Sequence, residues 1–137
     1  MKKYAHFCCL LALLLALTGC GRPSDIPISP MESDLFTEED YRSAAEVVKK
    51  QMSSREFNES ADITPLGIRY AGDEKTEAEQ EYICTFGDYD EGIVLLSDFQ
   101  VGESTGAWEP DSTYSGWQWF LARKDGGAWV IVTSGYG

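Results

Sequence analysis

Hydrophobic and polar positions follow two different periods along the chain, and the first of them is helical. Between residues 37 and 55, apolar side chains recur every three or four residues, which places them on one face of a helix. These positions are Tyr41, Ala44, Ala45, Val48 and Met52. Thr37 precedes the three acidic residues 38–40, and this order is typical of a capped helix start rather than of a metal site. We therefore expect a helix from Thr37 to about Arg55.

The second period begins after Ser60, where apolar and polar positions alternate as they do in strands. Turn residues divide this part into five predicted strands: 66–70, 79–86, 93–101, 117–123 and 129–133. Tyr82, Cys84 and Phe86 share one face of the second strand, so Cys84 is expected to be a small buried side chain. Residues 124–127 read Lys-Asp-Gly-Gly and predict a tight hairpin turn, because glycine supplies positive φ.

The order of these elements predicts an α+β fold, in which an N-terminal helix packs on a curved antiparallel sheet of four to five strands. The central strands are apolar on both faces, as in residues 93–96. One helix covers only one face of a sheet, so the second face needs another cover. Two arrangements would provide this cover: a homodimer formed through the sheet, or strong curvature that creates a concave pocket with the helix across its mouth.

The chain begins with the parts of an export signal. Lys2 and Lys3 precede an apolar run, 7–17, that is shorter than the roughly 20 residues of a membrane-spanning helix. Leu17-Thr18-Gly19-Cys20 resembles the lipobox of bacterial lipoproteins, in which the cysteine is lipidated and becomes the mature N-terminus. This resemblance implies a signal peptide over 1–19, a lipid such as palmitate on Cys20, and anchoring on the extracytoplasmic face of the cell membrane. The alternative is an ordinary signal peptide with an incidental cysteine.

Residues 20–36 contain three prolines among polar residues and show neither period, which is typical of an extended linker. The predicted organisation is therefore a signal peptide over 1–19, a lipidated tether over 20–36 and a single α+β domain over 37–137.

The chain carries 23 acidic and 11 basic residues, a formal net charge of −12. Removal of residues 1–19 takes away Lys2 and Lys3 but no acidic residue, which leaves a net charge of −14. Such a charge argues against nucleic acid or anionic lipid as the partner, because both require clustered positive charge. The acidic charge is compatible with basic peptides, or with a positive patch on a partner protein, as the partner.

Signal cleavage would also remove His6, the single histidine of the chain, together with Cys8 and Cys9. With Cys20 lipidated, Cys84 would be the remaining thiol, so we expect no intramolecular disulfide. A chain without histidine lacks Ser-His and Cys-His nucleophiles and imidazole metal sites. Residues 88–92 contain spaced acids but lack the later bidentate Glu of a calcium loop, and favour a turn. We expect no cofactor and no metal.

The end of the chain carries a second resemblance. Residues 119–123 end a strand in Arg, and residues 126–132 turn through two glycines into a strand with Trp129. After a capped helix and a curved sheet, this hairpin resembles the nuclear transport factor 2-like superfamily, which implies a cystatin-like α+β cone over residues 37–137. The whole chain is similar to small lipoproteins of Gram-positive bacteria without an assigned activity. The superfamily contains both enzymes and binding modules, so the resemblance does not fix a function.

A pocket enzyme of the isomerase or dehydratase type requires a carboxylate base in an apolar site and a hydroxyl that stabilises the developing oxyanion. Asp98 is the candidate base because it continues the apolar row of residues 94 and 96 on one strand face. Tyr82 or Tyr114 would then donate. The alternative is that Asp98 ends its strand, caps a turn or pairs with Arg123.

Aromatic side chains with hydrogen-bonding neighbours suit sugars, and Trp108 and Tyr114 are candidates for the rim of such a site, whereas Trp117 and Trp119 are expected in the core. Our first interpretation is a non-enzymatic binding or protein-interaction module with an unknown ligand. Trp108, Tyr114 and Asp98 are its candidate ligand-binding residues. The alternatives are a pocket enzyme that uses Asp98 with a tyrosine, and a module that binds wall glycans.

Overall fold

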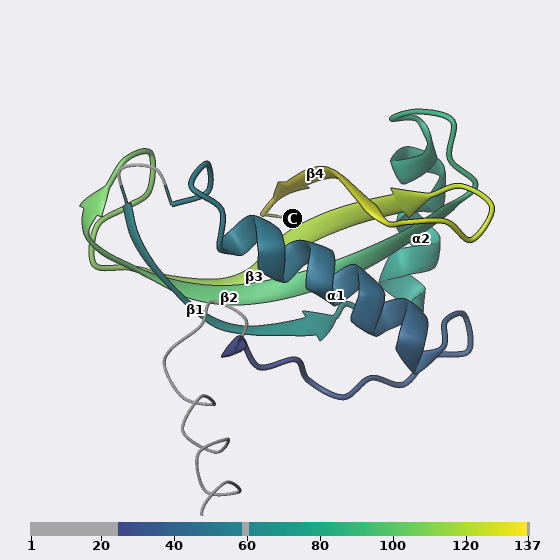
Figure 1. Ribbon diagram of the computed structural model, residues 1–137, viewed down its shortest axis with the longest axis horizontal. Coiled ribbons are helices and arrows are strands. Elements are labelled where there is room, and N and C mark those ends of the chain that lie inside the picture. The colour runs from purple at the N-terminus through teal and green to yellow at the C-terminus, as the bar shows by residue number, and fades with distance from the viewer. Residues whose placement is uncertain (1–24, 59–60, 137) are drawn as a thin grey trace, which may run out of the picture.

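Four strands form one antiparallel sheet in the computed structural model, which describes residues 25–58 and 61–136 (Figure 1). The elements are α1 (Glu38–Met52), β1 (Ala61–Tyr70), α2 (Asp73–Cys84), β2 (Glu91–Thr105), β3 (Thr113–Arg123) and β4 (Val130–Gly135). The strands lie in chain order, with α1 on one face and α2 on the other, here called the second face. This confirms an α+β fold with a four-stranded sheet. Neither of the described helices is long and apolar enough to span a membrane.

Helix α1 begins where the sequence predicts. Thr37 is its N-cap and forms a capping box with Asp40. The Thr37 hydroxyl oxygen accepts a hydrogen bond from the Asp40 amide at 3.1 Å, and the Thr37 amide donates to Asp40 Oδ2 at 3.0 Å. The five apolar positions predicted to form its buried stripe are the buried residues of the helix. The helix ends at Met52, slightly before the expected end.

The space between α1 and the sheet is filled with side chains. Leu95, Phe99 and Trp119 are at most 2% exposed and belong to the same hydrophobic cluster as the buried face of α1. Figure 1 shows α1 lying across the inside of the curved strands. Among the described residues, this region is therefore a packed core, and not the concave pocket that was one of the two expectations.

Residues 79–86 were expected to form a strand, and this prediction is wrong because residues 73–84 form α2. The short alternation around Cys84 follows a run of Glu, Lys, Ala and Gln, which have high helix propensity. Lys75 Nζ lies 2.6 Å from Glu79 Oε1 one turn further on, which supports the helix. Cys84 is consequently half-buried at a helix end rather than buried in a strand.

Helix α2 covers one end of the second face. Ile83 is fully buried and packs with Val94 and Ala122 in a separate small cluster. Gln80 Nε2 donates to the Gly92 carbonyl oxygen at 2.5 Å, and Gln80 Oε1 accepts from the Gly92 amide at 2.9 Å. Val94 and Ala122 are thus buried by α2 of the same chain, so a homodimer through this face is not needed to bury them.

The segment before α1 belongs to the folded domain. Ile26 and Phe36 are 8% and 7% exposed in the main core. The Ser29 amide donates to the Ile68 carbonyl oxygen, and the Ile68 amide donates to the Pro27 carbonyl oxygen, both at 2.9 Å. The expected tether is therefore wrong for residues 25–36, because proline is compatible with pairing at the edge of a sheet. Residues 1–24, with the expected signal peptide and Cys20, lie outside the described residues.

The predicted hairpin between the last two strands is confirmed. The Gly127 amide donates to the Lys124 carbonyl oxygen at 2.9 Å. Asp125 and Gly126 have φ angles of 51° and 68°, and two consecutive positive values are typical of a tight hairpin turn. Strands β1, β2 and β3 are longer than predicted, because pairing continues into polar residues at their ends.

Candidate functional site

Asp98 lies on the second face of the sheet, where both neighbouring strands are bulged. The pairing of β1 with β2 shifts between Pro65 and Gly67, and in β3 two residues, Ser115 and Gly116, lie opposite Asp98. Gly116 has a φ of 75°, a conformation that favours glycine. The alternation along β2 had predicted this face for Asp98, and that part of the prediction is confirmed.

Three donors occupy the Asp98 carboxylate. Its Oδ1 accepts from the Gly116 amide at 2.8 Å and from the Ser115 hydroxyl at 3.1 Å, and its Oδ2 accepts from Arg69 Nη1 at 2.5 Å. Burial alone would raise the pKa of Asp98, but the Gly116 amide and the Arg69 guanidinium outweigh it and hold the pKa below 3.8. A general base of the expected kind needs a raised pKa, so this arrangement does not suit the role.

The ion-pair partner of Asp98 is Arg69, and the alternative pairing with Arg123 is wrong. Arg123 Nε donates to Glu91 Oε2 at 2.6 Å, and its Nη1 donates to Asp40 Oδ1 at 3.1 Å. The Arg123 guanidinium also lies 4.2 Å from the centre of the Trp129 ring. Arg123 therefore joins α1, β2 and the closing hairpin.

Tyr82 and Tyr114, the candidate donors of the enzyme hypothesis, do not converge on Asp98. Tyr114 stacks on Phe99 at 5.2 Å between ring centres, on the α1 face of the sheet. Adjacent residues of a strand point to opposite faces, so Asp98 points away from both rings. Tyr82, on α2, contacts Phe120, whose pairing partner on β2 is four residues from Asp98, roughly 13 Å along the strand.

Trp108 and Tyr114, the candidate glycan-binding residues, belong to an aromatic cluster on the α1 face. The cluster consists of Phe57, Phe99, Trp108, Tyr114, Trp117 and Tyr136. The Tyr114 ring is stacked between Phe99 and Tyr136, with the Tyr136 ring centre at 5.5 Å. Trp108 is half-buried and meets Phe99 and Tyr114 edge-on. Both candidates therefore pack the end of the domain, although the sequence suggested free ring faces.

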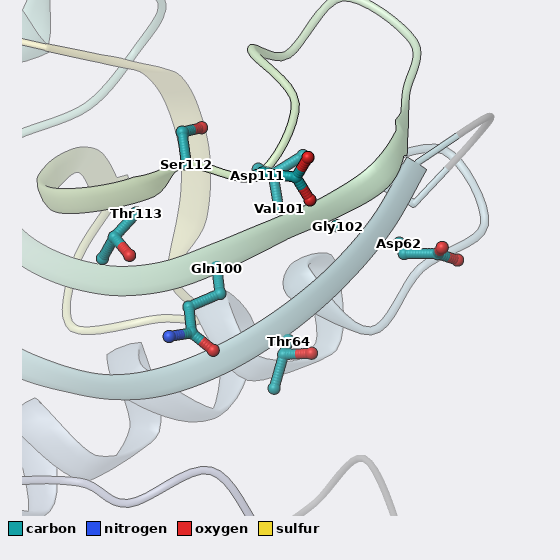
Figure 2. A pocket seen from close by; sticks show the side chains of 8 residues that line it. All are labelled: Asp62, Thr64, Gln100, Val101, Gly102, Asp111, Ser112 and Thr113. Atoms are coloured by element: carbon teal, nitrogen blue, oxygen red, sulfur yellow. The ribbon is translucent and has the colours of Figure 1, made fainter.

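An open pocket lies on the second face, beyond the end that α2 covers. It has a volume of about 290 Å³, and Figure 2 shows the side chains that line it. The lining residues are Asp62, Thr64, Gln100, Val101, Gly102, Asp111, Ser112 and Thr113. Thr64, Gln100 and Thr113 are paired across β1, β2 and β3, so they form one polar row. No hydrogen bond within the described residues occupies these three side chains.

The pocket is negatively charged. Asp62 and Asp111 line it, neither takes part in an ion pair with a described residue, and the lining contains no basic side chain. The absence of a side chain at Gly102 leaves space beside Asp62. A Cβ at this position would lie only 3.0 Å from Asp62 Cβ. The turn before β3 is fixed by the Asp111 amide, which donates to the Gly102 carbonyl oxygen at 3.0 Å. Such a site suits a ligand that donates hydrogen bonds and carries positive charge.

Residues 88–92 serve the hairpin that closes the sheet. Asp88 Oδ1 lies 3.3 Å from Lys124 Nζ, and the Asp90 carboxylate accepts from the Asp125 amide at 3.1 Å. Asp88 and Asp90 thus lie in the connection between α2 and β2 and hold the β3–β4 turn, whereas Glu91 and Gly92, also predicted in the turn, begin β2.

The pocket is not evident from the sequence. Asp98, Gln100 and Gly102 alternate with buried Phe99 and Val101, so the sequence shows that one face of β2 becomes polar. The partners of that face could not be assigned, because they come from other strands through bulged pairing. Comparison of the chain with protein families, curated proteins and solved structures found no significant match.

Proposed function

We propose that the protein is a lipid-anchored, extracytoplasmic binding module that captures a basic segment of a partner protein and has no enzymatic activity. The observation that carries this proposal is the open pocket, with two acidic side chains and a row of free hydroxyl and amide groups. Ammonium and guanidinium groups donate several hydrogen bonds at once, and carboxylate, amide and hydroxyl oxygens accept them. The net charge, −12 for the whole chain and −14 without residues 1–19, adds long-range attraction for such a segment.

The interior of the domain supports binding rather than catalysis. The space under α1 is packed with Phe99 and Trp119, and the Asp98 carboxylate is held by three donors. A helix inside a curved antiparallel sheet also supports the proposed kinship with the nuclear transport factor 2-like superfamily. In this chain the interior of the proposed cone is closed, so recognition takes place on its outer face.

Anchoring through Cys20 is the second part of the proposal. It rests on the resemblance of residues 17–20 to a lipobox. Metabolic labelling with a palmitate analogue, followed by membrane fractionation, tests it directly. The wild type is expected to be labelled and to sediment with membranes, whereas Cys20→Ser is expected to lose the label. A labelled Cys20→Ser protein would contradict the anchor but not the pocket.

Binding of a fluorescent hexalysine peptide to the full-length chain in detergent tests the pocket. Replacement of both Asp62 and Asp111 by Asn is expected to weaken binding about fivefold or more, because it removes the two charges that face the ligand. Binding by the wild type is expected to weaken with salt. A hexaglutamate peptide serves as the ligand control and is expected not to bind.

The matched protein control is the double variant Glu74→Gln and Glu77→Gln on α2, where both side chains are exposed. It removes the same charge from the molecule but leaves the pocket unchanged, and its affinity is expected to stay within about twofold of the wild type. Equal losses in the two double variants would show that only net charge attracts the peptide, and the pocket would then be rejected as the site.

A further inference from the structure

The two edges of the sheet differ in how they are covered. The outer edge of β1 is paired with residues 27–29 through the hydrogen bonds to Ile68 described above, and β1 also contains Pro65 and a bulge. The outer edge of β4 pairs with no strand of the described chain (Figure 1). Free strand edges tend to pair with other chains unless charge, proline or a bulge prevents it. β4 has neither a charged residue nor a proline, and its one bulge, at Val132, leaves residues 133–135 in regular pairing with β3.

The free edge is also free of charge. Residues 126–137 contain no acidic or basic side chain, in a chain whose net charge is −12. Two copies of such an acidic protein repel each other over most of their surface, and the repulsion is weakest where no charges face each other. The β4 edge is therefore a place where two copies can approach closely.

Exposed apolar side chains gather beside this edge. Val130 and Tyr136, at the two ends of β4, are 45% and 58% exposed. Tyr82 and Phe86, exposed at the end of α2, contact each other, and Tyr82 also contacts Phe120 on β3. Phe120 pairs with Thr133, so these rings flank β4 on the second face. A strand added to β4 would cover part of this surface.

We propose that β4 is a dimerisation edge, on which a second copy of the chain adds its own β4 in antiparallel orientation. An antiparallel pair of identical strands is two-fold symmetric, so each contact occurs twice and the assembly closes as a dimer. The bulge at Val132 puts Val130 on the second face and Tyr136 on the α1 face, so pairing about Thr133 brings Val130 against the partner strand on one face and Tyr136 on the other. Valine, isoleucine and threonine at 130–133 favour such pairing. The result is one continuous eight-stranded sheet.

The oligomeric state of the full-length chain in detergent, measured by analytical ultracentrifugation over a range of concentrations, tests this proposal. The wild type is expected to show a monomer–dimer equilibrium that shifts toward dimer as salt increases, because salt screens the repulsion between acidic copies. Val130→Lys and Ser134→Lys are each expected to raise the dimer dissociation constant roughly tenfold or more, since two-fold symmetry introduces each lysine twice. Ser134 is exposed, so its variant keeps the domain core intact.

Leu66→Lys is the matched control, because Leu66 is an exposed apolar residue of β1 at the opposite edge. Its dissociation constant is expected to stay within about twofold of the wild type, and circular dichroism checks that all variants are folded. A wild type that stays monomeric up to about 100 µM would overturn the proposal. It would do so even if β4 were then found to pair with a strand of another protein. A dimer that tolerates both β4 variants, or that Leu66→Lys weakens equally, would also overturn it.

Discussion

The Asp98 carboxylate accepts hydrogen bonds from an amide, a hydroxyl and a guanidinium, and these contacts hold the β3 bulge against β2. Residues Ser115 and Gly116 oppose Asp98 alone, so the carboxylate binds the extra residue that the bulge inserts. Because burial is outweighed by these donors, the pKa of Asp98 is lowered. The folded state therefore binds the proton of this carboxyl less readily than the unfolded state does.

Asp98→Asn is expected to lower the free energy of unfolding at pH 7 by about 1–2 kcal/mol. The loss is this small because the ion pair is partly exposed to solvent. The lowered pKa means that the contribution of the charge is complete above the unfolded value of 3.8 and is lost as the pH falls through the folded value. Urea unfolding of the two proteins from pH 7 downward is expected to show their stabilities converging in acid. Asp62→Asn, at an exposed residue without an ion pair among the described ones, controls for loss of charge. A difference that stays constant with pH would contradict this account.

Residue-scale predictions from the sequence succeeded where only alternation mattered. The face of Asp98 follows from the apolar row at 94 and 96, and the structure confirms it. Its partner could not be predicted, because Arg69 comes from another strand and Gly116 reaches Asp98 only through a bulge. Alternation specifies a face, whereas the register between strands depends on insertions that no local pattern records.

At the scale of elements, α1 and α2 show when the pattern of a segment is sufficient. α1 has a capping residue and a full apolar stripe, and its start and buried residues agree with the prediction. α2 buries only Thr76 and Ile83, so its helical period is barely visible, and the brief alternation around Cys84 suggested a strand. A helix with such a small apolar face is held largely by specific contacts, among them the paired hydrogen bonds of Gln80 with Gly92.

The packing of α2 on β2 predicts a compensating pair of substitutions. A Cβ at Gly92 would lie 2.7 Å from Ile83 Cγ2, so Gly92→Ala is expected to cost about 1–3 kcal/mol through overpacking. Ile83→Ala is expected to cost about 2–5 kcal/mol because it leaves a cavity. The double variant is expected to lose less unfolding free energy than the two single variants together, by about 1 kcal/mol or more, since the new methyl group occupies the vacated space.

Chemical denaturation of the single and double variants measures this coupling. Gly135→Ala is the control, because a Cβ at Gly135 has no atom within 4 Å, and its effect is expected to add to that of Ile83→Ala. If Gly92→Ala and Ile83→Ala were simply additive, α2 would not pack on β2 as described.

At the scale of the whole molecule, the chain before α1 contributes to both the core and the sheet. The Tyr41 hydroxyl donates to the Ser29 carbonyl oxygen at 2.8 Å, and the Ser33 hydroxyl donates to Asp73 Oδ1 at 2.5 Å. The Asp73 carboxylate also accepts from the Tyr70 hydroxyl, and burial raises the pKa of Tyr70 to about 12. One short segment thus contacts α1, β1 and the start of α2. The sequence could not reveal these contacts, because a single bridge to a strand produces no repeating pattern of apolar residues.

These contacts predict where the folded domain begins. A chain that starts at Asp25 is expected to unfold cooperatively in urea with the stability of the full-length protein. A chain that starts at Thr37 loses Ile26 and Phe36 from the core, each worth about 2–4 kcal/mol, together with the pairing at the β1 edge. Because small domains are stable by only about 5–15 kcal/mol, it is expected to lose its cooperative transition. Equal stability of the two chains would mean that residues 25–36 are a tether after all, and that the α+β domain is complete from residue 37.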